Sequence, residues 1–136
     1  MHLIIHIAFG LFLLGIFNNP LVLFLAIFIG HFLLDSIPHY KPLKRIFIET
    51  IIDILLSIIF IFFYLVFGTG HSSVWIFSGA IFFAILPDMF LLIDWLWKVK
   101  IIKPFMLDFH RKIQHEYQWG WIIELGLLFY LLFFLF

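Results

Sequence analysis

Five long apolar runs make up most of the chain, and short polar or turn-forming segments separate them. The runs cover residues 1–17, 21–37, 46–67, 73–97 and 119–136. They stop at Asn18-Asn19-Pro20, at Pro38, at Gly68-Thr69-Gly70 and in a basic segment broken at Pro104, all of which are signals that end helices. Because about 20 apolar residues span a bilayer, we predict an all-α fold, an integral membrane bundle of four to five transmembrane helices.

The predicted helices should differ in how they cross the bilayer. Runs 1–17, 21–37 and 119–136 are close to the shortest spanning length of about 17 residues, so we expect one of them to be re-entrant or enclosed by protein. Pro87 lies inside run 73–97 and predicts a kink there. For residues 105–117 we predict a short interfacial helix.

Composition indicates that lipid is the main solvent of the chain. Of 136 residues, 65% are apolar and only 12% are charged, whereas a soluble domain carries about 25% charged residues. We therefore expect one membrane domain over residues 1–136 with membrane lipid as its partner, and a homo-oligomer is a further candidate. The net charge of zero gives no electrostatic attraction to nucleic acid, and the absence of cysteine excludes disulfides and thiolate metal sites.

The lysines and arginines set the expected orientation. All eight lie in residues 41–45 and 98–112, which the order of the five crossings places on one side of the membrane. By the positive-inside rule this side is cytoplasmic. The turns at residues 18–19 and 68–73 then face the opposite side, and neither contains Lys or Arg.

On this topology the acids and histidines gather in the cytoplasmic half. All eight carboxylates and six of the seven histidines fall there, and only His71 lies on the far side. Ionisable groups at membrane depth are costly and usually line a site or a cavity. The cluster therefore predicts a shared metal or proton-handling site that faces the cytoplasm. Its candidate members are His6, His31, Asp35, Asp53, Asp88, His110 and His115.

Spacing along the helices adds detail to this cluster. His31 and Asp35 are four residues apart and so share one helix face, where they can bind one cation or one can orient the other. His2 and His6 repeat this spacing, although His2 lies near the terminus and the simpler interpretation is a solvated side chain. Asp88 follows a proline, where a kink frees backbone carbonyls.

The two histidines of the basic segment are less regular. His110 and His115 are five residues apart, which is about 140° around an ideal helix. They reach one metal only if the helix breaks there, and otherwise they serve different partners. A single membrane histidine is more often a hydrogen-bonded packing element than a ligand, so the prediction rests on convergence from several helices.

Four short pieces of the chain combine histidine with an acid or an arginine: His6, GHFLLD, LPD at Leu86–Asp88, and HRKIQH. Together they resemble the signature pieces of the membrane-bound metal-dependent hydrolase family known from the bacterial SOS regulon, namely an early His, H-x-x-x-D, P-D-x-D-H and H-R-G-x-T-H-S. After Asp88 the second acid and the histidine of that motif are missing. The matching positions are His6, His31, Asp35, Asp88, His110, Arg111 and His115.

We therefore predict a membrane-embedded metal-dependent hydrolase that acts on a lipid or lipid phosphate at the cytoplasmic interface. Arg111 and Asp53 are the candidate catalytic residues, and Arg111 suits the role because guanidinium binds phosphate through paired hydrogen bonds. The metal is expected to be zinc, with magnesium or manganese as alternatives. Its expected ligands are His6, His31, Asp35, Asp88, His110 and His115. The alternative functions are a metal-ion or proton transporter or channel, and a non-enzymatic structural membrane subunit.

Overall fold

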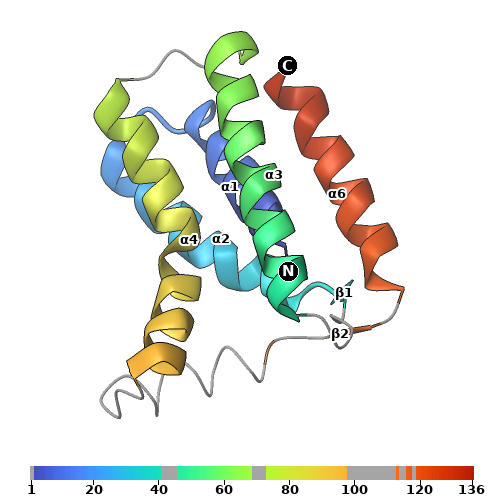
Figure 1. The fold of residues 1–136 in the computed structure, drawn as a ribbon. Helices are drawn as coiled ribbons and strands as arrows, with labels where there is room; N and C mark the ends of the chain where they lie inside the picture. The colour runs from blue at the N-terminus through green and yellow to red at the C-terminus, as the bar shows by residue number, and fades with distance from the viewer. Residues whose placement is uncertain (1, 41–45, 69–72, 98–112, 114–115, 118) are drawn as a thin grey trace.

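The computed structural model describes residues 2–40, 46–68, 73–97, 113, 116–117 and 119–136 (Figure 1). Within these residues the chain forms five helices, which confirms the all-α prediction. The ends of each helix lie within three residues of the corresponding apolar run. The helices are α1 (Leu3–Leu14), α2 (Pro20–Ser36), α3 (Ile46–Phe67), α4 (Val74–Trp97) and α6 (Gly120–Leu135).

A short pair of parallel strands joins two distant connections. β1 (His39–Tyr40) follows α2, and β2 (Glu116–Tyr117) precedes α6. The interfacial helix predicted for residues 105–117 is therefore wrong at its last two residues, because they pair with an extended segment far away in the sequence. Most of that predicted helix lies outside the described residues.

Local sequence explains where α2 begins and ends. Pro20 occupies its first turn, and the side chain of Asn19 accepts hydrogen bonds from the backbone N–H groups of Leu21 and Val22 at 3.0 and 3.3 Å. The helix ends at Ser36, because Ile37 precedes a proline and takes an extended conformation with ψ of 138°. This end of α2 carries the polar residues of the candidate site.

Helix α1 occupies the centre of the fold and packs against α2, α3, α4 and α6. Its 12 residues extend about 18 Å, well short of the roughly 30 Å hydrocarbon core of a bilayer. It is thus the enclosed helix expected among the three short runs. Gly10 lets α1 approach α4 closely, since a Cβ atom placed there would lie 3.2 Å from the Cβ of Ala84.

The outward faces of the other helices are apolar. Phe62, Leu65 and Phe133 are among many large apolar side chains that are exposed. By length and composition, one helix within the described residues, Ile48–Phe67 of α3, is able to cross a membrane, and only 17% of its most apolar window is buried. In contrast, several polar side chains are buried between the helices: His6, His31, Asp35, Ser57 and Glu124.

Candidate metal centre

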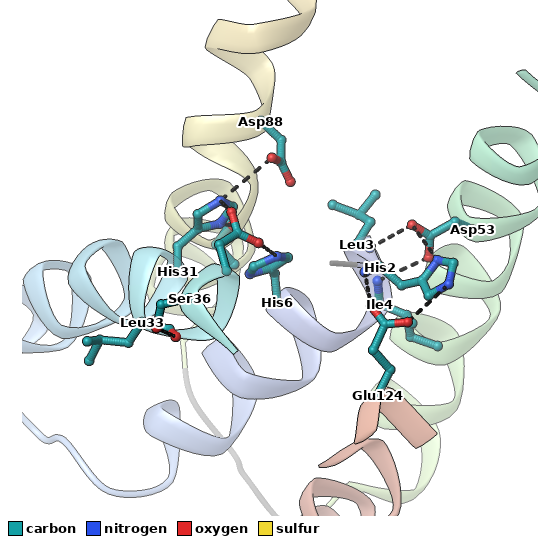
Figure 2. A network of polar contacts seen from close by, with 12 residues as sticks. His2, Leu3, Ile4, His6, His31, Leu33, Ser36, Asp53, Asp88 and Glu124 are labelled. Atoms are coloured by element: carbon teal, nitrogen blue, oxygen red, sulfur yellow. Dashed lines mark hydrogen bonds and ion pairs between the residues drawn. The ribbon is translucent and has the colours of Figure 1, made fainter. Parts of the chain in front are cut away.

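Helices α1, α2 and α4 bring histidine and aspartate side chains together (Figure 2). His6 comes from α1, His31 and Asp35 from α2, and Asp88 from α4. His6 Nε2 lies 3.2 Å from Asp35 Oδ1, and His31 Nε2 lies 3.4 Å from Asp35 Oδ2. His31 Nε2 is also 3.6 Å from Asp88 Oδ1. We call these four residues the metal group.

Two local features of the helices place these side chains. The four-residue spacing puts His31 and Asp35 on the same face of α2, as predicted, and their side chains contact each other. Pro87 lies inside α4, and Figure 1 shows that this helix changes direction partway along its length. A proline in a helix removes one backbone hydrogen bond and opens the turn before it, which is the turn that faces His31.

A backbone carbonyl in that turn fixes the orientation of His31. The Nδ1 atom of His31 lies 2.8 Å from the carbonyl oxygen of Ala84. Because a carbonyl only accepts hydrogen bonds, Nδ1 carries the proton and donates it. Nε2 then faces the carboxylates of Asp35 and Asp88. Histidines that bind metals are typically held in this way, by a hydrogen bond from the second ring nitrogen.

The geometry of the metal group suits a divalent cation. One atom each from His6, His31 and Asp88 lies within 4.8 Å of the others. Two ligands at tetrahedral positions, each about 2.1 Å from zinc, are separated by about 3.4 Å. The contact of 3.6 Å between His31 Nε2 and Asp88 Oδ1 is close to this value. The third donor, from His6, lies within 4.8 Å of both and would have to move closer to share the same ion.

Charge and hydrogen bonding also favour a bound metal ion. Two carboxylates face two imidazoles in a largely buried group, and a divalent cation would balance their charge. The rings of His6 and His31 stack with their centroids 3.9 Å apart, so a nitrogen of each lies close enough to the other to share one ion. Neither ring nitrogen of His6 makes a hydrogen bond to any described residue. The residues present therefore fit a metal.

One member of the metal group reaches the surface. The side chains of His6, His31 and Asp35 are at most 1% exposed, whereas that of Asp88 is 36% exposed. The group is thus enclosed on the side of α1 and α2 and accessible from the side of α4. Catalytic metal sites need such an open side for water or substrate, whereas purely structural sites are closed by four protein ligands.

A second polar cluster surrounds the start of α1. Asp53 of α3 accepts hydrogen bonds from the backbone N–H groups of Leu3 and Ile4 at 2.6 and 3.3 Å. Glu124 of α6 accepts one from the N–H of His2 at 3.2 Å. These two carboxylates supply the cap that α1 lacks in its own sequence. The nearby carboxylates, Asp53 above all, raise the pKa of His2.

The structure corrects the predicted role of Asp53 and the predicted pairing of His2 with His6. Asp53, predicted to be catalytic, lies in this second cluster and caps α1 instead of contacting the metal group. His2 and His6 do not share a helix face, because His2 precedes α1 with an extended backbone, φ −68° and ψ 139°. Figure 2 shows His2 and His6 directed toward different clusters.

The remaining predicted site residues, His110, Arg111 and His115, lie outside the described residues. Sequence reasoning missed the carbonyl of Ala84, because nothing in the sequence shows which backbone oxygen a histidine will contact. It also missed the capping role of Glu124. The only available signal was that the start of α1 carries no acidic residue of its own.

No family model, curated protein or solved structure matches this chain. The resemblance to the membrane-bound hydrolase family therefore stays a prediction based on four short motifs.

Proposed function

We propose that this protein is a membrane-embedded, metal-dependent hydrolase that acts on a lipid or lipid phosphate. The observation that carries the proposal is the metal group, in which two histidines and two aspartates from three helices meet between otherwise apolar helices. Buried ionisable residues in such an environment are costly unless they serve a site. Their donor set of imidazole and carboxylate suits zinc best, and manganese or magnesium next.

Membrane insertion is supported by where the apolar side chains lie. The outward faces of α2, α3 and α6 carry rows of exposed Leu, Ile and Phe, and the buried positions include His and Asp. This is the reverse of a soluble domain, where polar residues cover the surface. In the proposed orientation, the basic segments 41–45 and 98–112 face the cytoplasm, and the metal group opens near that side.

Each residue of the site has a proposed task. A divalent metal bound by His6, His31 and Asp88 would supply Lewis acidity and an activated water. Asp35 contacts both imidazole rings and holds them in position. Arg111, in the basic segment, would bind the phosphate of the substrate through two parallel hydrogen bonds. The partly exposed side of Asp88 is where the substrate would approach.

The test is to compare three proteins reconstituted in mixed lipid vesicles: wild type, His31→Gln and Arg111→Lys. The measurements are bound metal, release of lipid head group, and metal or proton flux. His31→Gln should lose metal and hydrolysis together, whereas Arg111→Lys should keep the metal and lose most of the hydrolysis, because lysine cannot make the paired contact. Flux without lipid cleavage would support a transporter and overturn the hydrolase proposal.

A further inference from the structure

A groove runs between α3 and α6, and α1 forms its floor. One end is a cavity of about 340 Å³, and the other is a hollow of about 380 Å³. Ile4 of α1 and Leu56 of α3 line both, so the two spaces adjoin. Figure 1 shows α3 and α6 extending along the same side of the molecule toward the C-terminus.

The two ends of this groove differ in chemistry. The hollow is lined only by apolar residues of α1, α3 and α6, including Phe63 and Leu132. The cavity also has apolar walls, but three carboxylates and one imidazole line it: Glu49, Asp53, Glu124 and His2. The groove is therefore amphipathic along its length, with an acidic end beside the start of α1 and an apolar end near the C-terminus of α3.

Among the described residues, three carboxylates at the acidic end face one imidazole and the start of α1. Asp53 and Glu124 face His2 and the first N–H groups of α1. Glu49 has no such partner among the described residues, and its buried Oε2 accepts no hydrogen bond there. Glu124 is only 3% exposed, and its Oε2 lies 3.4 Å from His2 Nε2. Among the described residues, Glu49 Oε2 is thus a carboxylate oxygen that lines the cavity without a hydrogen-bond donor.

The length of the groove matches one hydrocarbon chain. From Asp53 at the acidic end to Phe63 in the apolar hollow, α3 rises by ten residues, or about 15 Å. A single lipid chain covers half of the roughly 30 Å hydrocarbon core, which is also about 15 Å. A ligand with one chain and a small polar head therefore fills both parts of the groove.

We propose that this groove binds a single-chain amphiphile with a cationic ammonium head group. The head lies against Glu49, Asp53 and Glu124, and the chain extends along α1 between α3 and α6. An anionic head is excluded by repulsion from the three carboxylates, and a neutral head leaves Glu49 without a cationic partner among the described residues. The metal group contacts α1 from the side of α2 and α4, so this site is separate from the proposed hydrolase function.

The test uses two probes of equal chain length, dodecylamine and dodecanol, each with a nitroxide label near the end of the chain. Trp121 lines the cavity, so quenching of its fluorescence reports binding to protein in neutral detergent micelles of fixed concentration. Trp121→Phe identifies the signal. Wild type should bind the amine at least about tenfold more tightly than the alcohol, as expected for a partly buried charge pair.

Three variants locate the ligand. Glu49→Gln should weaken amine binding about tenfold and leave alcohol binding unchanged, and it preserves the cap of α1, in which Glu49 takes no part. Leu56→Trp narrows the junction of the two spaces and should weaken both probes. Asp88→Asn, in the metal group, should change neither.

Three outcomes would overturn the proposal. Equal binding of amine and alcohol to wild type would remove the role of the acidic end. Unchanged amine affinity in Glu49→Gln would do the same, and a Leu56→Trp variant that binds both probes normally would place the chain elsewhere. Because Glu49→Gln should keep its bound metal and its hydrolysis, failure here is distinguishable from failure of the hydrolase proposal.

Discussion

In the proposed zinc site Asp88 is a direct ligand, so replacing it with asparagine should remove most of the stabilisation by zinc. Asp88 supplies one of the three donor atoms that lie within 4.8 Å of one another, and its Oδ1 is 3.6 Å from His31 Nε2. Since altering even groups that only orient the ligands costs about 10- to 100-fold in metal affinity, loss of a direct carboxylate ligand should cost about 100-fold. The side chain is 36% exposed, so the amide is not left buried and unpaired.

The expected size of the effect follows from mass action. At a free zinc concentration about 100 times the Kd of wild type, binding stabilises the fold by about 2.7 kcal/mol. After a 100-fold loss of affinity, the same zinc concentration equals the Kd and contributes only about 0.4 kcal/mol. For a chain of this size, each kcal/mol corresponds to roughly 4 °C in Tm. Zinc should therefore raise the Tm of wild type by about 10 °C and that of Asp88→Asn by about 2 °C.

The assay is thermal unfolding of purified protein in detergent, with a chelator or with buffered zinc. Glu49→Gln is the matched control, because it makes the same change from carboxylate to amide away from the metal group, and its zinc shift should equal that of wild type. The reasoning is refuted if zinc leaves the wild-type Tm unchanged. It is equally refuted if Asp88→Asn keeps the full shift, because Asp88 would then not be a ligand.

Three further predictions concern the fold and its orientation. The pKa of His2 is raised above its ordinary value of 6.5. Its stabilising contribution is therefore full below pH 6.5 and is lost as the pH rises through the raised pKa. The Tm difference between wild type and His2→Gln should accordingly shrink as the pH rises. Gly10→Leu should destabilise the fold by about 1–3 kcal/mol through overpacking against α4, measured as a fall in Tm. Gly126→Ala, where an added Cβ meets nothing within 4 Å, should not destabilise it. Cysteines at positions 44 and 72 should be labelled from opposite sides of the membrane in intact cells, and equal labelling of both from outside would contradict the proposed topology.

The helices were predictable because strong local signals bound each apolar run. Proline and an asparagine cap start α2, and the proline at position 38 stops it. Half of the metal group was predictable for a similar reason, since His31 and Asp35 sit four residues apart on one helix. His6 and Asp88 were added through the predicted order of membrane crossings, which places both near the same side, and through the family resemblance.

The second polar cluster was not predictable in the same way. Nothing near the start of α1 in the sequence shows that a carboxylate from α3 will cap it, because the cap spans about 50 positions. The central place of α1 was equally hidden. In a soluble protein, polar residues mark the outer face of a helix, but the exposed face of α3 is apolar, and so is the enclosed helix α1. An apolar run alone therefore does not show which of the two helices is enclosed.

The position of α1 also sets the order in which the molecule can assemble. This helix is synthesised first, yet the backbone N–H of His2 bonds to Glu124, 122 residues later in the chain. At about 5–20 residues per second, roughly 6–24 s pass during translation before that partner exists. Helices α2, α3 and α4 are made within this interval, but α1 still lacks its contacts with α6. Folding should accordingly be slow and non-local, with the packing of α6 against α1 as the last step.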